Sequence, residues 1–173
     1  MAITLYDSTV GCFLQTLGAV EGFLAKGVAH CKEKNLDPNE LVETRLYPDM
    51  LPFRFQVVAV AHHSAGALAG AKAGAFAPPG PSTADYAGLQ KLVTEAKQSL
   101  EQLKPADVNA LEGKDVLFSV RDLKLPFKAE GFLMTFSMPN FHFHATTAYD
   151  ILRSKGVPLG KRDYMGRMKL TTS

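Results

Sequence analysis

Histidines are the side chains of this sequence best suited to chemistry near neutral pH. Four of the five occur in two places: His62 and His63 are adjacent, and His142 and His144 lie close to Asn140. An imidazole ordinarily changes charge near pH 6.5, so it can act as an acid, a base or a metal ligand. These two groups are therefore the first candidates for a functional site.

Helical spacing predicts which of these side chains can meet. Asn140 and His144 are four residues apart and share one helix face, whereas His142 points about 200° around the helix from Asn140. In the earlier segment, the apolar stripe turns His63 inward and leaves His62 toward the edge. We predict that His63, Asn140 and His144 converge in a polar pocket.

Three roles remain open for this pocket. His63 and His144 could act together as an acid–base pair or bind a small molecule without a cofactor. A divalent metal, zinc or nickel, needs three or four ligands, and here Asn140 would be a poor third ligand. The histidines could also form hydrogen bonds with one another in a purely structural network.

Further candidates lie outside the two histidine groups. Asp49 follows a proline at the start of a helix and could line the pocket entrance, or it could cap a turn. Tyr149 is nine residues after Asn140, so only a kink at Pro139 would bring it near the pocket. Asp7 is a secondary candidate.

The two cysteines are predicted to be small buried side chains with no catalytic role. Cys12 and Cys31 are 19 residues apart on one expected helix, which separates them by about 28 Å and prevents a disulfide. We expect a reducing, cytoplasmic compartment.

Apolar residues at 3–4 spacing predict four long helices, over 5–34, 53–73, 82–103 and 130–155. A shorter helix is expected from Pro38 to Arg45. Pro78-Pro79-Gly80-Pro81 marks a long loop, and 115–120 with 123–128 is typical of a hairpin. Pro139 should kink the last helix. Four glycines in the first helix suggest close approach of a neighbouring helix: Gly11, Gly18, Gly22 and Gly27.

The composition is that of one ordinary globular domain, which we expect to span residues 1–173. It is 46% hydrophobic and 21% charged with a net charge of +2. The longest apolar runs are too short to cross a membrane, and no nucleic-acid motif is present. Basic residues gather between Arg153 and Lys169, either as a solvated terminus or as a patch for an anion or partner.

Four stretches resemble the DUF1993 family. They are Leu5-Tyr6-Asp7, the segment from Arg45 to Pro52, the segment from Pro139 to Tyr149, and the segment from Gly156 to Tyr164. The resemblance implies an all-α fold, the DinB-like up-down four-helix bundle, with long crossover connections and a small β-hairpin between the third and fourth helices. It also implies a homodimer.

Many members of this DinB-like superfamily hold a divalent metal with three histidines, one on the second helix and two spaced His-x-x-x-His on the fourth. The resemblance places His63 and His144 at two of these positions and Asn140 at the third.

The function predicted from these observations is a small-molecule-binding enzyme with His63 and His144 as its acid–base groups. Asn140, Asp49, Tyr149 and His62 would contact the substrate. The reaction would be an isomerisation, cyclisation or elimination. The alternatives are a metal-dependent transferase or hydrolase, and a non-catalytic structural or stress-related dimer. We expect a small-molecule ligand, and neither nucleic acid nor membrane as a partner.

Overall fold

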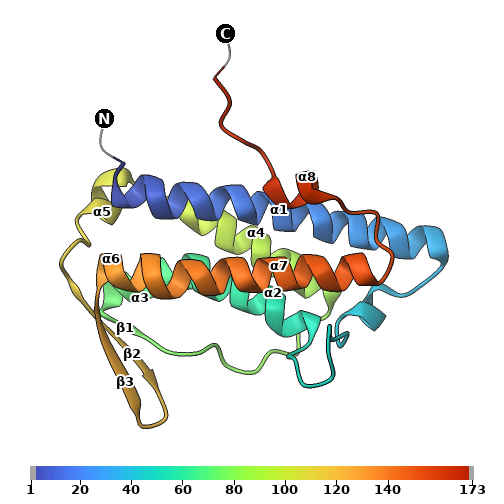
Figure 1. Ribbon diagram of the computed structural model, residues 1–173, viewed down its shortest axis with the longest axis horizontal. Coiled ribbons are helices and arrows are strands. Elements are labelled where there is room, and N and C mark those ends of the chain that lie inside the picture. The colour runs from blue at the N-terminus through green and yellow to red at the C-terminus, as the bar shows by residue number, and fades with distance from the viewer. Residues whose placement is uncertain (1–2, 172–173) are drawn as a thin grey trace.

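The computed structural model describes residues 3–171, which are mostly helical with one small three-stranded sheet (Figure 1). Four helical rods account for most of the chain. The first is α1 and the third is α4, whereas the second and fourth rods each contain a π-helical turn. Their bounds are α1 Leu5–Lys34; α2 Phe53–Ala61, η2 His62–Gly66 and α3 Ala67–Ala73; α4 Tyr86–Glu101; α6 Ala129–Gly131, η3 Phe132–Ser137 and α7 Met138–Ser154.

The apolar stripes of the rods form the core. The stripe predicted for α1 is buried along its length, as are its counterparts on α2, α4 and α7. Figure 1 shows α2 and α4 running in the same direction, opposite to α1 and α7. The rods therefore do not simply alternate up and down, because the long connection after Phe76 carries the chain back to the other end of the molecule before α4 begins. The connection after Glu101, in contrast, stays at the end where α4 finishes and α7 begins.

The second and fourth rods depart from α-helical geometry where they face each other. The segment expected as one helix over 53–73 contains the π-helical turn η2, and the fourth rod contains η3 just before Pro139. Proline has no N–H and its ring clashes with the carbonyl four residues earlier. The interruption predicted at Pro139 thus takes the form of a wider turn, and such turns are frequent at functional sites.

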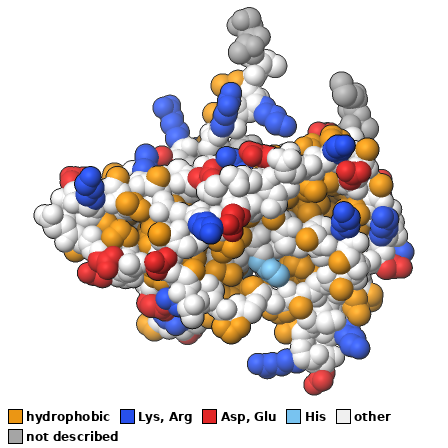
Figure 2. All heavy atoms as spheres, turned by 180° about the vertical axis from the view of Figure 1, so that it is seen from behind, with side chains coloured by type: hydrophobic (Ala, Val, Ile, Leu, Met, Phe, Trp, Pro, Cys, Tyr) orange, Lys and Arg blue, Asp and Glu red, His pale blue; other side chains and the backbone are white. Residues whose placement is uncertain are grey.

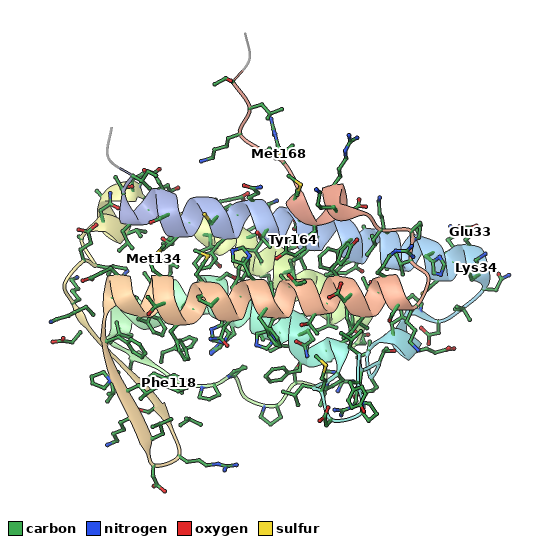
Figure 3. All side chains as sticks on the ribbon, viewed as in Figure 1. Glu33, Lys34, Phe118, Met134, Tyr164 and Met168 are labelled. Carbon is green, nitrogen blue, oxygen red and sulfur yellow. The ribbon has the colours of Figure 1, made fainter. Side chains whose placement is uncertain are left out.

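The predicted hairpin is present and packs against the rods. Strand β2 (Asp115–Val120) pairs antiparallel with β3 (Leu123–Lys128). A two-residue strand, β1 (Ala75–Phe76), adds a parallel edge that was too short to predict. Phe118 of β2 packs on Phe76 and Phe136, with ring centroids 6.3 and 4.8 Å apart (Figure 3). The hairpin thereby supports the end of the two interrupted rods.

Two helix boundaries differ from the sequence predictions. The short helix after Asp37 is a single 3-10 turn, η1 (Pro38–Leu41). The third rod begins at Tyr86, four residues later than predicted, because Asp85 caps it by accepting a hydrogen bond from Gly88 N. A further short helix, α5, spans Pro105–Asn109.

The last short helix, α8 (Lys161–Met165), lies against α1. Lys26 and Asp163 form an ion pair of 2.6 Å, and Gln15 donates a hydrogen bond to the Met165 carbonyl. Figure 2 shows Lys and Arg side chains around the extension that follows α8. Within residues 3–171, no helix is both long and apolar enough to cross a membrane.

Gly27 and Gly22 of α1 differ in the space around them, and only Gly27 lies against a neighbouring side chain. A Cβ on Gly27 would clash with the Tyr86 hydroxyl, which is fixed by its hydrogen bond to the Leu24 carbonyl. A Cβ on Gly22 would meet nothing within 4 Å. The predicted close approach therefore occurs at Gly27, where the neighbour is a tyrosine of α4.

This contrast predicts opposite effects of two matched substitutions. Gly27→Ala should lower the free energy of unfolding by about 1–3 kcal/mol, because it overpacks the core. Gly22→Ala should raise it by up to about 1 kcal/mol, because alanine favours the helix. Urea denaturation of both variants measures these changes, and equal effects at the two sites would contradict the assignment.

Candidate functional site

The structure brings His63 and His144 together between the second and fourth rods. Their rings are nearly parallel, with centroids 5.9 Å apart and an interplanar angle of 16°. His63 lies in the π-helical turn η2 and is only 8% exposed, whereas His144 on α7 is half-buried. The two histidines selected by helical spacing are thus neighbours in space.

Gln56 fixes the orientation and tautomer of His144. Its amide nitrogen donates to the Leu51 carbonyl at 2.8 Å, which turns its amide oxygen toward His144 Nδ1, also at 2.8 Å. In the neutral imidazole, Nδ1 therefore carries the proton and donates to Gln56 Oε1. Nε2 of His144 keeps its lone pair, and it has no hydrogen-bond partner among residues 3–171.

Gln56 is the residue of this site that the sequence reasoning missed. It precedes His63 by seven residues, or two helical turns, so the two share a face. Its side chain is only 2% exposed. A polar side chain in register with His63 on a core-facing stripe is the signal that would have found it.

Burial keeps both imidazoles neutral at pH 7. Loss of hydration, together with the smaller effects of the nearby His62 and His144, lowers the pKa of His63 to about 3. Burial likewise lowers the pKa of His144 to about 4. Nδ1 of His63 is buried without a hydrogen-bond partner in the part of the chain that the structure describes.

Aromatic rings surround the two imidazoles. Phe55 and Phe143 contact His144 edge-on, with centroids 5.6 and 5.2 Å away. Phe76 and Phe136 pack on His63 at 5.6 and 5.8 Å. Phe143 is 57% exposed and Phe55 is half-buried, so the His144 side of the pair lies nearest the surface. The surroundings are apolar, and the polar atoms of the pair are uncharged.

Asn140 and His62 contact the backbone instead of joining the pair. Asn140 Nδ2 donates to the Phe136 carbonyl at 2.8 Å, one turn earlier in its own rod. Nε2 of His62 lies 2.7 Å from the Ala77 carbonyl, and its ring stacks on Phe76 with centroids 4.3 Å apart. His62 therefore lies at the edge, as predicted, but Asn140 does not direct its amide nitrogen toward the histidines.

The structure does not bring three other candidates to the pair. Tyr149 packs against Phe23 and Tyr164, on the side of α7 that faces α1 and α8 (Figure 3). Asp49 is exposed in the connector before α2. Asp7 belongs to the capping box of α1, where its hydrogen bonds with Thr4 lower its pKa.

The cysteines are both free, but only one is buried. Cys31 is 1% exposed, and burial raises the pKa of its thiol. Cys12 is exposed, which corrects the prediction that both would be buried. Cys12 lies on the outer side of α1, because the first helix has only one apolar stripe.

Two hollows lie beside the second rod. One, of about 380 Å³, is lined by Phe55, Val58 and two prolines of the long loop, Pro79 and Pro81. The other, of about 290 Å³, is lined by His62 and residues of α4. Neither of them is lined by His63 or His144, so the pocket between α2 and α7 stays a prediction.

The donor set does not fit a three-ligand metal site. Within residues 3–171, no group of three His, Cys, Asp or Glu side chains could hold a metal ion. His63 and His144 provide two imidazoles, and the neutral amide oxygen of Asn140 would be a weak third ligand for zinc or nickel. Zinc and nickel sites ordinarily need at least one more protein ligand.

Comparison with known proteins defines the family. The model of DUF1993, a domain of unknown function, matches residues 5–165. The chain belongs to the DUF1993 family. A crystal structure of a DinB family member from Shewanella denitrificans is similar, with a TM-score of 0.80 and 26% sequence identity over 98% of this chain and 96% of that chain. No curated protein matches this sequence.

These findings support a DinB-like fold for this DUF1993 protein. Homodimer formation and a cytoplasmic location stay predictions.

The lowered pKa values predict how stability depends on pH. The unfolded chain binds protons at its histidines near pH 6.5, whereas folded His144 and His63 bind them only near pH 4 and 3. Because the unfolded state binds more protons in this range, the free energy of unfolding should fall as the pH decreases from 6.5 toward 4.

His144→Gln should make this dependence shallower, since one of the two imidazoles is removed. Urea denaturation at pH 7, 5.5 and 4.5 measures the slope, and Gln98→Ala on the exposed face of α4 is the control. An unchanged slope in His144→Gln would show that His144 is not held neutral by burial.

Proposed function

We propose that this DUF1993 protein is a small-molecule-binding four-helix bundle of the DinB-like type, whose ligand lies against His63 and His144. One observation carries the proposal: the buried imidazole of His63 and the half-buried imidazole of His144 are stacked 5.9 Å apart, and His144 is oriented by Gln56. The hydrogen bond made by one ring nitrogen of a histidine decides which nitrogen carries the proton, so the bond to Gln56 leaves Nε2 of His144 as the acceptor.

The chemistry of the surroundings defines the ligand class. Four phenylalanine rings contact the pair, and the lone pair of His144 Nε2 is free to accept a hydrogen bond. A charged ligand would lose hydration here without gaining an opposite charge from these neighbours. The proposed ligand is therefore small and largely apolar, and it carries one hydrogen-bond donor.

Ligand binding is better supported than strong base catalysis. A general base works best when its pKa lies near the working pH, and the pKa of His144 is about 4. In the catalytic form of the proposal, Nε2 of His144 accepts a proton from the ligand and returns it at another position, which is an isomerisation. This step requires a ligand whose proton is already acidic.

The ligand class is testable with two probes that differ in one hydroxyl. Phenol should bind more tightly than toluene by about 5–10-fold, the difference expected from one hydrogen bond of roughly 1 kcal/mol. Nitrogen–proton NMR titrations of the wild-type protein measure both affinities and locate the shifted residues on α2 and α7.

In His144→Leu, which retains apolar volume but removes the acceptor, the preference for phenol should disappear. Equal affinities for phenol and toluene in the wild-type protein would contradict the proposal, as would shifts confined to other elements.

The role of Gln56 gives a second prediction. Gln56→Leu keeps the size of the side chain but removes the acceptor for His144 Nδ1–H, so the imidazole should become a mixture of tautomers. Long-range nitrogen–proton NMR spectra of the ring measure the tautomer directly. Gln56→Glu, which retains the acceptor, is the control and should preserve the Nδ1–H form.

If the wild-type imidazole carries its proton on Nε2, the assignment of Gln56 as the positioning residue is wrong.

A further inference from the structure

The side chain of Asn140 forms a hydrogen bond to the backbone of its own rod. Pro139 cannot donate a backbone hydrogen bond, and it directly follows the first residue of α7, after the π-helical turn Phe132–Ser137. The side chain of Asn140 supplies a donor in this region, because its Nδ2 lies 2.8 Å from the Phe136 carbonyl. The amide nitrogen is thereby turned back along the helix.

Position 140 is nevertheless the position from which a third ligand could join the pair. It lies one helical turn before His144 and on the same face. Within residues 3–171, Nε2 of His144 has no intramolecular hydrogen-bond partner, and Nδ1 of His63 is buried without one. A good donor at position 140 would complete the three protein ligands that a site with an open fourth position requires.

We propose that residue 140 decides whether this histidine site holds a divalent metal, and that Asn140 keeps it metal-free because its neutral amide oxygen is a poor ligand for zinc or nickel. The inference concerns the same histidines as the proposed function. It depends on the residue at position 140 and not on the identity of the organic ligand. The chain consequently has the scaffold of a metal site from which one ligand is missing.

Two substitutions add a ligand at this position. Asn140→Asp is nearly isosteric and adds a carboxylate, and Asn140→His adds an imidazole. Isothermal titration of untagged protein with zinc chloride measures the affinity, and cobalt absorption spectra report the ligands. Both variants should bind zinc at least about 100-fold more tightly than the wild-type protein, as expected when a two-ligand site gains a third.

Matched controls separate the added ligand from other effects. Asn140→Ala removes the amide without adding a donor, so its zinc affinity should equal that of the wild-type protein. Combining His144→Gln with Asn140→Asp should return the affinity to the wild-type value. Circular dichroism and thermal unfolding establish that each variant is folded. If Asn140→His does not fold, the near-isosteric Asn140→Asp alone tests the effect of the added ligand.

Three results would overturn the inference. In the first, the wild-type protein binds one zinc ion as tightly as Asn140→Asp and loses it in His63→Gln. In the second, folded Asn140→Asp gains no affinity. In the third, Asn140→Ala gains as much as Asn140→Asp. The phenol titration uses metal-free wild-type protein. If phenol and toluene bind equally well, the proposed function is wrong, but the zinc affinities of the Asn140 variants still test the inference about residue 140.

Discussion

The packing of α2 and its π-helical turn against α7 is the constraint on which the histidine site depends. This contact brings Gln56 and His63 from one rod to His144 on the other, although Gln56 and His144 are 88 residues apart in the chain. The same burial that brings the rings together removes their hydration and lowers their pKa values. Proximity and neutrality of the two imidazoles therefore have one physical cause.

Backbone irregularity is concentrated at this contact. The π-helical turn η2 contains His62 and His63, which serve different neighbours: His62 bonds the Ala77 carbonyl at the start of the long loop, and His63 faces His144. The facing turn η3 precedes Pro139, and Asn140 supplies a hydrogen bond there. π-Helical turns are frequent at functional sites, where the backbone departs from the geometry that is most stable for a helix.

The match to DUF1993 and the similarity to a DinB family member define the fold of this chain. They say less about the chemistry of its histidine site. A scaffold hosts different functions through the residues placed on it. In this chain, one asparagine stands where the resemblance implies a metal ligand, and a glutamine orients one of the remaining histidines. In our proposal, these two amides distinguish a ligand site built from neutral imidazoles from a metal centre on the same rods.

The sequence by itself determined the helices, the hairpin and the inward direction of His63, because these follow from the spacing of apolar residues along a local segment. The stripe from Phe13 to Leu24 and the strands at 115–128 agree with the structure. Tertiary structure alone decided that Gln56 binds His144, that Asn140 turns to Phe136 and that Gly27 meets Tyr86. Partners, tautomers and pKa values depend on atoms that distant segments bring within a few ångströms, and local periodicity carries no information about those atoms.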